Sequence, residues 1–266
     1  MAVFGFIGLG NMGGALARAA GKKLSGPALL LSNRSREKAL RLAEELNAQP
    51  SDNLSIAENA DYIFLGVKPQ MLPALLAELA PVFKSRPSPF VLVSMAAGTD
   101  IQAVQGMAGG SYPVLRIMPN TPAAIGQGMI LYSPSRNVEP AALEVFLDSM
   151  SGAGRFLRLE ERLIDAASAV SGCGPAFVDI FLEALADGAV ACGLPRAAAR
   201  ELAAQMVLGS AALALSSPEH TASLKDAVCS PGGTTIQGLR LLEQKGFRSA
   251  VIEAVIAAYE KNFDLK

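Results

Sequence analysis

The hydrophobic positions of the chain follow two different patterns, one before and one after about residue 160. Before it, short runs that are apolar on both faces alternate with segments of helical periodicity. These runs predict five buried strands and two shorter terminal ones, over Val3–Gly8, Ala28–Ser32, Tyr62–Val67, Phe90–Met95, Val114–Met118, Met129–Tyr132 and Arg155–Leu159. Buried strands separated by helices are typical of a parallel sheet covered on both faces. Residues 1–160 therefore predict an α/β domain, a doubly wound sheet of Rossmann type.

The pattern after residue 160 is helical throughout. Apolar residues recur at helical spacing over Leu163–Gly193, Arg196–Leu215, Ala222–Val228, Thr235–Lys245 and Phe247–Phe263. The first of these segments is interrupted by Gly172, Gly174 and Pro175. Alanine-rich faces suit close helix packing, and a second copy of the chain is a natural partner for so much small apolar surface. Residues 161–266 therefore predict an all-helical domain for substrate binding and dimerisation.

Composition and charge narrow the classes of partner. About half of the 266 residues are hydrophobic and few are charged, as in a compact globular protein. A formal net charge of −1 provides no basic surface for a nucleic acid. The N-terminus lacks the basic region and cleavage site of a signal peptide, and charges, Gly or Pro break the apolar runs short of about 18 residues. We therefore expect neither a nucleic-acid partner nor a membrane span.

The cysteines and the histidine indicate a reducing compartment without a metal site. Cys173, Cys192 and Cys229 are odd in number and lack the spacing of metal ligands, so reduced thiols in the cytoplasm are the simplest account. His220 is the single histidine, and no carboxylate cluster accompanies it at ligand spacing. It lies in a polar linker, where a surface or helix-capping role is the expectation.

A glycine-rich segment follows the first predicted strand and opens the first helical pattern. Gly8, Leu9, Gly10, Asn11, Met12 and Gly13 have the spacing G-x-G-x-x-G. In this position the glycines allow a tight turn, a close approach of the backbone to a pyrophosphate, and close packing of helix on strand. The N–H groups of the helix N-terminus then favour phosphate. The segment predicts a dinucleotide site, the alternative being a tight turn that binds nothing.

The residues after the second predicted strand bear on which dinucleotide binds. NAD-selective folds place Asp or Glu there, whereas this chain reads Ser32-Asn33-Arg34-Ser35-Arg36. Arg34 can form charge-assisted hydrogen bonds to a 2′-phosphate, and Asn33 and Ser35 can add neutral ones. We therefore expect NADPH, with NADH as a weaker alternative. If Asn33 and Ser35 only cap the next helix and Arg34 is solvated, this preference has no basis.

Three later loops also follow predicted strands. They contain Val67, Lys68 and Pro69, then Ala96, Ala97 and Gly98, then Met118, Pro119 and Asn120. Because ligands of an open parallel sheet bind at the carboxyl ends of its strands, we expect these loops to line the nicotinamide side. No nucleophile–base pair accompanies them. The sequence favours a reaction that needs orientation and hydride transfer more than a strong protein base.

Taken together, the motifs resemble those of the pyrroline-5-carboxylate reductases. Five segments occur in that family's order: F-I-G-L-G-N-M-G, G-V-K-P-Q, R-I-M-P-N-T-P, S-G-C-G-P-A-F and D-A-V-C-S-P-G-G-T-T-I-Q-G-L-R-L-L-E. They span nearly the whole chain, and the last is the most specific. The resemblance implies reduction of 1-pyrroline-5-carboxylate to L-proline with NAD(P)H, the last step of proline biosynthesis. It also implies a homodimer with interlocking helices, in some members assembled as a pentamer of dimers.

The resemblance also implies site residues. Cofactor contacts fall on the Gly8–Gly13 loop and on Asn33, Arg34, Ser35, Asn53, Val67, Lys68, Pro69, Ala96, Ala97, Gly98 and Asn120. Substrate contacts fall on Ser230, Gly233, Thr234 and Thr235, with Glu161 close by. Backbone N–H groups of Gly233–Thr235, at a helix N-terminus, can hold the substrate carboxylate. The hydroxyl of Thr235, the predicted catalytic group, can bond the ring nitrogen.

Two alternatives stay open at this point. A β-hydroxyacid dehydrogenase has a similar N-terminal fold and a helical second domain, but it uses a lysine of that second domain as its acid–base. The candidates here are Lys225, Lys245 and Lys261, and none lies in the short glycine-rich pattern expected around that lysine. A non-catalytic NADP-sensing module would need no substrate turn, so an intact S-P-G-G-T-T segment argues against it.

Overall fold

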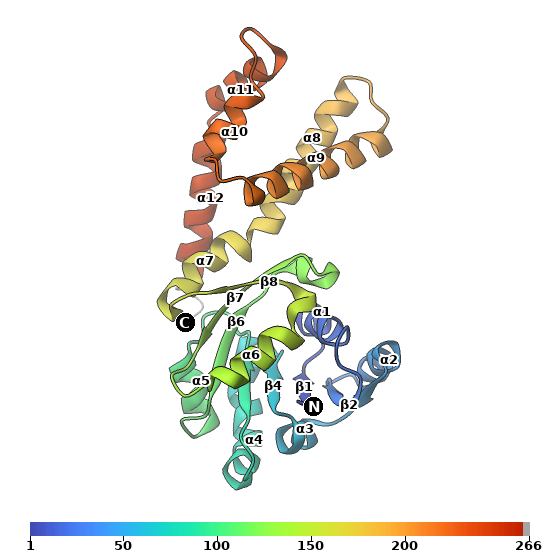
Figure 1. Ribbon diagram of the computed structural model, residues 1–266, viewed down its shortest axis with the longest axis vertical. Helices are drawn as coiled ribbons and strands as arrows, with labels where there is room; N and C mark the ends of the chain where they lie inside the picture. The colour runs from blue at the N-terminus through green and yellow to red at the C-terminus, as the bar shows by residue number, and fades with distance from the viewer. Residues whose placement is uncertain (263–266) are drawn as a thin grey trace. The chain divides into compact units, whose positions relative to one another are not determined.

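The computed structural model describes residues 1–262 and divides into two compact units (Figure 1). One unit consists of Met1–Cys173 with the residues from Ala258 onward, and the other of Gly174–Ala257. Helix α7 (Ile164–Ser171) therefore belongs with the sheet in this division. The predicted domain boundary lies ahead of α7, after residue 160, and stays a prediction.

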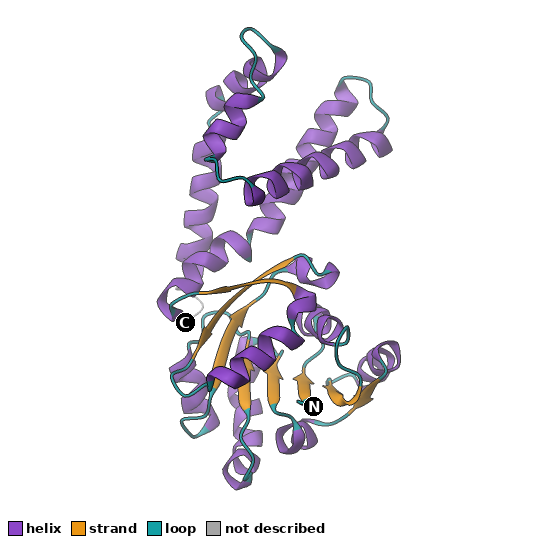
Figure 2. Cartoon of the chain, in the orientation of Figure 1, coloured by secondary structure: helices purple, strands orange, loops and turns teal. Residues whose placement is uncertain are grey.

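The first unit is built on one eight-stranded sheet with helices on both faces (Figure 2). The strand order is β3-β2-β1-β4-β5-β6-β7-β8. The strands are β1 (Phe4–Ile7), β2 (Gly26–Ser32), β3 (Ala48–Pro50), β4 (Tyr62–Leu65), β5 (Val91–Ser94), β6 (Val114–Met118), β7 (Gly128–Pro134) and β8 (Gly154–Arg158). The order reverses between β1 and β4, as in doubly wound dinucleotide-binding folds. The predicted Rossmann-type fold is confirmed.

The last two strands depart from the parallel arrangement that the apolar runs predict. β7 pairs antiparallel with β6, whereas the other neighbouring strands pair in parallel. Between β6 and β7 the chain holds only the short 3-10 helix Thr121–Ile125. A parallel return needs a crossover of about a dozen residues or more, so this connection forces a reversal. Helix α6 (Pro140–Ser149) supplies such a crossover between β7 and β8, which are parallel.

The helices bury a separate apolar cluster on each face of the sheet. One face is covered by α1 (Asn11–Ala20), α2 (Arg36–Leu46) and α6, and the other by α3 (Asn53–Asn59), α4 (Leu72–Ser85) and α5 (Ile101–Ala108). On the first face, the rings of Phe6 and Phe64 stack with centroids 4.1 Å apart, and Phe64 stacks on Phe146. Full burial of a phenylalanine contributes about 1.5–3 kcal/mol, so these rings fix α6 firmly against β1 and β4.

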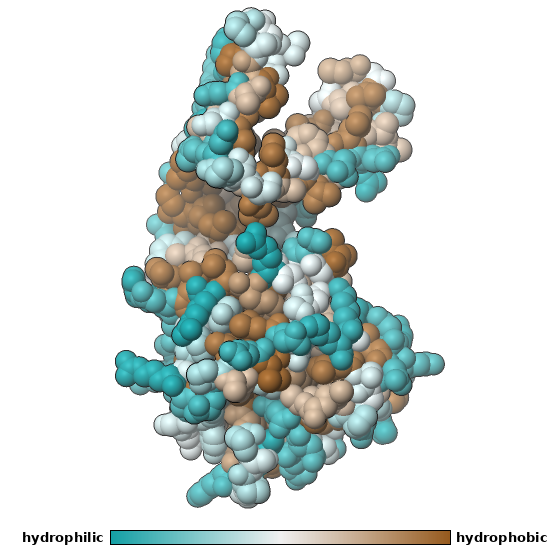
Figure 3. All heavy atoms as spheres, viewed as in Figure 1, coloured by the Kyte–Doolittle hydropathy of each residue, from teal (hydrophilic) through white to brown (hydrophobic). Residues whose placement is uncertain are grey.

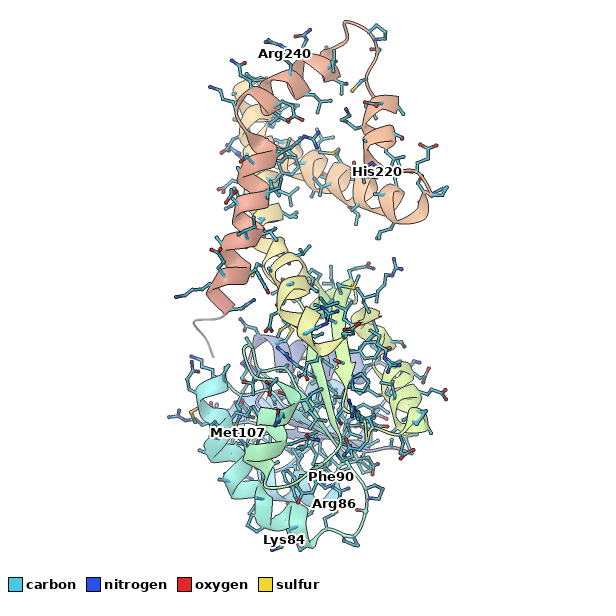
Figure 4. The ribbon with its side chains drawn as sticks, turned by 90° about the vertical axis from the view of Figure 1, so that its left-hand side faces the viewer. Lys84, Arg86, Phe90, Met107, His220 and Arg240 are labelled. Carbon is cyan, nitrogen blue, oxygen red and sulfur yellow. The ribbon has the colours of Figure 1, made fainter. Side chains whose placement is uncertain are left out.

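Arg86, which lies near Phe90 (Figure 4), holds the end of α3 on the second face. Its guanidinium donates to the carbonyl oxygens of Ala57 and Ala60 at 2.8 and 2.7 Å and lies 5.0 Å from the centre of the Phe90 ring. Burial lowers the pKa of Arg86, and the nearby Asp61 carboxylate opposes that shift. The arginine thus satisfies carbonyls that the end of a helix leaves without partners. It keeps α3 in place beside β1 and β2.

The second unit is helical throughout its described residues. Its helices are α8 (Gly174–Ala191), α9 (Arg196–Ser216), α10 (Thr221–Ala227), α11 (Thr234–Gln244) and most of α12 (Phe247–Lys261). The break predicted at Gly172–Pro175 separates α7 from α8. The last predicted helical segment reaches Phe263, which lies outside the described residues.

This helical unit leaves most of its apolar side chains exposed. The residues of α8–α12 that are buried are three alanines, Ala186, Ala199 and Ala203. Large apolar side chains are exposed on every helix from α8 to α12 except α10, among them Ile180, Leu202, Leu208, Leu215, Leu241 and Ile252. Figure 3 shows brown apolar patches on these helices, among teal and white residues. Single apolar residues scattered over a surface are normal, but this many exposed apolar side chains mark an interaction surface.

Among the described residues one segment, Glu161–Ala191, is long and apolar enough to cross a membrane by length and composition alone. Its most apolar window has a mean hydropathy of 1.4 and is 11% buried. From the sequence, each apolar run is expected to be broken short of that length. Glycines do break the helix here, but they leave the mean hydropathy high. The exposed apolar residues also extend over α9, α11 and α12, which a single membrane crossing does not explain.

Candidate functional site

The glycine-rich loop lies where the strand order reverses, between the neighbouring strands β1 and β4. Gly8 follows β1, has a φ of +95°, and a Cβ placed on it would lie 2.6 Å from the carbonyl oxygen of Gly66, which follows β4. A Cβ on Gly13 would overlap the carbonyl oxygen of Gly8. The main chains of the two loops and the start of α1 therefore touch directly. Gly8, Gly13 and Gly66 are glycines because the fold itself leaves no room for a side chain.

Gly10 is different. It has φ −62° and ψ −167°, a conformation open to any residue, and a Cβ placed on it would meet nothing within 4 Å. No side chain of the described residues caps the N-terminus of α1, which begins at Asn11. The first-turn N–H groups are thus left to solvent or a ligand. The fold gives no reason for a glycine at this position, whereas a pyrophosphate approaching the backbone does. The loop fits the dinucleotide that the sequence predicts.

Asn33 connects this loop to the end of β2. Its Oδ1 accepts a hydrogen bond from the N–H of Leu9 at 2.9 Å, and its Nδ2 donates to the carbonyl oxygen of Ser35 at 3.2 Å. Asn33 is predicted to contact the cofactor. In the structure its side chain ties together the two loops that would hold the pyrophosphate and the adenosine ribose. Ser35 is the N-cap residue of α2, but its side chain makes no capping hydrogen bond.

Arg34 is exposed beside an open hollow of about 1080 Å³ at the end of β2. Asn33 and Asn53 also line this hollow, and Oδ1 of Asn53 accepts from Oγ of Ser32 at 2.7 Å. The carboxylate of Asp52 also lines the hollow, but it is engaged in hydrogen bonds within its own segment. It caps α3, and hydrogen bonds from the N–H and hydroxyl of Ser55 lower its pKa. Arg34 is therefore available for a phosphate.

The three remaining cofactor loops lie along one edge of the sheet. β1, β4, β5 and β6 are neighbours and run in the same direction, so their carboxyl ends meet at that edge. The loops there hold the predicted residues Val67, Lys68 and Pro69 after β4, Ala96, Ala97 and Gly98 after β5, and Asn120 after β6. The topology thus brings together segments that are up to 53 residues apart (residues 67 to 120). Their contacts with a nicotinamide stay predictions.

Asn120 is buried, and both ends of its side-chain amide are engaged. Its Oδ1 accepts from the N–H of Met129 at 3.0 Å, at the start of β7, and its Nδ2 donates to the carbonyl oxygen of Ser171 at 2.9 Å, at the end of α7. The side chain therefore joins three elements at the carboxyl edge of the sheet. Any contact of Asn120 with the cofactor would have to use its backbone or replace one of these bonds.

The Ser-Pro-Gly-Gly segment forms a tight turn that leads into α11. The N–H of Gly233 donates to the carbonyl oxygen of Ser230 at 3.0 Å, and Gly232 has a φ of +71°. Gly233 is the N-cap of α11, and no side chain of the described residues caps this helix. Thr234 and Thr235 form its exposed first turn. The turn thus presents main-chain N–H groups and two hydroxyls at the positive end of a helix, an arrangement suited to a carboxylate.

His220 lies at the start of α10 (Figure 4). Its Nδ1 accepts from the N–H of Ala222 at 3.1 Å, so it is the N-cap residue of that helix. The expected capping role of the single histidine is confirmed.

Glu161, predicted to lie near the substrate, is held inside the first unit. Its Oε1 accepts from the N–H of Ile101, the first residue of α5, at 2.6 Å and lies 3.6 Å from the guanidinium of Arg116. Arg116, on β6, also donates to Asp165 of α7 at 2.6 Å. One carboxylate oxygen of Glu161 is therefore committed to an ionic cluster around the buried Arg116. Its contact with the substrate stays a prediction.

Comparison with known proteins identifies the family. A family model described as pyrroline-5-carboxylate reductase dimerisation matches residues 161–265, and one described as NADP oxidoreductase coenzyme F420-dependent matches residues 3–98. The pyrroline-5-carboxylate reductase of Synechocystis sp. is 42% identical over 98% of this chain and 97% of the relative. The chain belongs to the pyrroline-5-carboxylate reductase family. The Escherichia coli reductase is 39% identical over 97% of this chain and 96% of its own.

Solved structures of the reductase family agree. The crystal structure of Plasmodium falciparum pyrroline carboxylate reductase with NADP bound has a TM-score of 0.87 and 32% identity, covering 98% of this chain and 97% of the other. The family predicted from the motifs is confirmed, as are the class of enzyme, an NAD(P)H-dependent oxidoreductase, and the order of a Rossmann sheet followed by a helical dimerisation region.

Sequence reasoning missed Arg116 and Asp165 as a pair. Asp165 lies unremarked in the predicted helical segment Leu163–Gly193, and Arg116 goes unnoticed inside the apolar run Val114–Met118. A signal was present, because a charged residue within a buried strand is rare unless it is paired. The partners, 49 residues away in the chain, could not be read from the sequence.

Gly10→Ala tests the dinucleotide loop of this reductase. The protein should fold normally, because the added methyl group meets nothing in the structure. The dissociation constant for NADPH should rise about tenfold or more, because the methyl group occupies the space that a pyrophosphate needs. Fluorescence titration measures the affinity and thermal unfolding measures the stability.

Gly106→Ala is the matched control, since Gly106 lies within α5 and a Cβ there also meets nothing within 4 Å. It should leave the NADPH affinity unchanged and stabilise the helix by about 0.5–1 kcal/mol. An unchanged affinity in Gly10→Ala would contradict binding of the pyrophosphate at this loop.

Proposed function

We propose that the protein reduces 1-pyrroline-5-carboxylate to L-proline by hydride transfer from NADPH, the last step of proline biosynthesis. The observation that carries this proposal is the uncapped start of α11 behind the Ser230–Gly233 turn, in a chain of the pyrroline-5-carboxylate reductase family. The substrate is a cyclic imine with a carboxylate beside it. An uncapped helix start is suited to the carboxylate, and an adjacent hydroxyl is suited to the ring nitrogen.

The carboxylate would be held by main-chain N–H groups of Gly233, Thr234 and Thr235. The helix dipole contributes about 0.3–1 kcal/mol, rising to about 2 kcal/mol when the site is partly buried. Several hydrogen bonds together add to this term. Because these groups are backbone, they keep the substrate in one orientation without side-chain rotamers to fix. Ser230 borders the same turn: a Cβ on Gly233 would overlap its hydroxyl.

The reaction adds a hydride to the imine carbon and a proton to the ring nitrogen. NADPH supplies the hydride when it is bound. The hydroxyl of Thr235 would bond the ring nitrogen and favour its protonated form, which makes the carbon more electrophilic. No strong protein base is needed, because the protonated nitrogen already draws electrons from the carbon to be reduced. The chain's task is to align two bound molecules, a contribution that can reach several kcal/mol.

The β-hydroxyacid dehydrogenase alternative is disfavoured by the surroundings of Lys225. Its Nζ lies 2.8 Å from Oδ1 of Asp226, and this hydrogen bond raises the pKa of Lys225. An acid–base group for that chemistry works best with a pKa near the working pH, which requires a shift in the opposite direction. Lys225 therefore does not suit that role.

The function is tested by a steady-state assay of 1-pyrroline-5-carboxylate with NADPH and NADH side by side. We expect turnover with both and a higher kcat/KM for NADPH. Arg34→Ala should raise the KM for NADPH about tenfold to a hundredfold and leave that for NADH almost unchanged, because a charge-assisted bond to the 2′-phosphate is worth about 1.5–3 kcal/mol.

Arg155→Ala, which removes an exposed arginine of β8, is the charge-matched control for Arg34→Ala and should change neither value. An equal loss for both cofactors would place Arg34 away from the 2′-phosphate. Absence of turnover in the wild-type protein would overturn the proposed function itself.

Thr235→Ala tests the catalytic hydroxyl. We expect kcat to fall about tenfold to a hundredfold while the dissociation constant for NADPH stays the same, since the hydroxyl would act on the substrate nitrogen. Thr235→Ser should recover most of the rate because it restores a hydroxyl. Wild-type turnover in the alanine variant would remove Thr235 from the mechanism.

We also propose that the protein is a homodimer in the cytoplasm, assembled through the helical unit and able to form a pentamer of dimers. The exposed apolar faces of α8, α9, α11 and α12 and the matching dimerisation family support the dimer. Three cysteines, an odd number without metal-ligand spacing, support a reducing compartment. Fractionation of the producing cells checks the compartment.

Sedimentation of Leu208→Glu tests the dimer. Leu208 of α9 is 59% exposed, and a charge there should shift the wild-type dimer or larger assembly toward monomer. Val145→Glu, at an exposed apolar position of α6, is the control and should sediment like the wild type. A monomeric wild type at micromolar concentration would refute the assembly.

A further inference from the structure

An ionic cluster around the buried Arg116 lies on the second face of the sheet, apart from the loops described above. Arg116 is 3% exposed, its guanidinium bonds Asp165 of α7 at 2.6 Å, and Glu161 lies 3.6 Å away. The Glu161 carboxylate in turn accepts from the N–H of Ile101, where α5 begins. The cluster therefore joins β6, α7 and the start of α5. None of these links is required by the cofactor or substrate contacts proposed so far.

The cluster fixes one end of α7, and Asn120 fixes the other. Asp165 lies in the first turn of α7 and bonds Arg116 in the middle of β6, while the carbonyl oxygen of Ser171 at its end accepts from Asn120 just beyond β6. Helix and strand therefore run in the same direction, toward the carboxyl edge of the sheet. Ile164 and Ala169 bury the inner side of α7. With both ends tied to β6, the segment Ser171–Cys173 has a set position at that edge.

Stability alone does not explain the cluster. Within the described residues, Nε of Arg116 is buried and has no hydrogen-bond partner. Replacing a buried ion pair with apolar side chains of similar size is often neutral or stabilising. The charges fix the positions of β6, α7 and the start of α5 relative to one another, at the edge of the sheet where the nicotinamide is expected. The Ala96–Gly98 loop lies directly ahead of α5.

We propose that Arg116 is a positioning residue for hydride transfer: through Asp165 and Glu161 it holds α7 and the start of α5 against β6. This proposal rests on the proposed function. It assigns Arg116 to the alignment of the nicotinamide ring and not to the binding of the cofactor's phosphates, which the loops at Gly10 and Arg34 provide. Loss of Arg116 should therefore reduce kcat far more than NADPH affinity.

The test compares wild type, Arg116→Lys and the double variant Arg116→Met/Asp165→Leu. The double variant replaces the buried pair with apolar side chains, so it should fold and melt near the wild-type temperature. We expect its NADPH dissociation constant to stay within about twofold and its kcat to fall at least about tenfold. The primary isotope effect with NADPH deuterated at the transferred position should increase, because hydride transfer becomes slower than product release. Arg116→Lys keeps a charge beside Asp165 and should recover part of the rate.

Arg158→Met, which removes an exposed arginine of β8, is the matched control and should behave like the wild type. A double variant with wild-type kcat and isotope effect would overturn the proposal. So would a loss of NADPH affinity equal to the loss of kcat, because that pattern indicates a general structural role. If the double variant does not fold, Arg116→Lys decides by the same two criteria. Failure of the proposed function would appear differently, as a wild-type protein that does not reduce the imine.

Discussion

The direct contact between the main chains of two loops, at the ends of β1 and β4, is the constraint on which the rest of this structure depends. Gly8 and Gly66 leave no space between their backbones, and Gly13 brings the start of α1 onto the same point. The contact fixes the origin of α1 relative to the sheet. It therefore fixes where the first-turn N–H groups of α1 lie, and a pyrophosphate bound there would take its position from them. The same contact also sets where the loop that carries Lys68 begins, since that loop leaves β4 at Gly66.

Most of the fold could be predicted from the sequence because its strands are buried on both faces. A run such as Tyr62–Val67 is apolar on both sides and is therefore easily recognised as a buried strand. The structure has a strand at Tyr62–Leu65. β3 was missed because it is a three-residue edge strand, largely exposed and ending in proline. The direction of β7 was missed for another reason. Hydropathy marks a strand but not its direction, which here is set by the short connection from β6.

The parts of the candidate site likewise differ in whether the sequence could predict them. Backbone-built parts, the Gly8–Gly13 loop and the Ser230–Gly233 turn, could be predicted because glycine and proline at fixed spacing restrict the main chain directly. Side-chain links such as Asn33 to Leu9, Asn120 to Ser171 and Arg116 to Asp165 could not. Their partners are 24 to 51 residues away, and only the folded sheet brings them together. Positioning residues are therefore hidden from the sequence more than binding residues are.

The chemistry proposed for the site explains why positioning would matter here. Substrate and product carry the same carboxylate, so the amides at the start of α11 would hold both about equally. Interactions that are equal in the ground state and the transition state do not raise kcat. Rate enhancement must then come from groups that act only as the hydride moves, namely the hydroxyl on the ring nitrogen and the surfaces that set the nicotinamide angle. The ionic cluster around Arg116 is proposed to act in the second way: by holding α7 and the start of α5 against β6, it would fix the helix and loop between which the ring would lie.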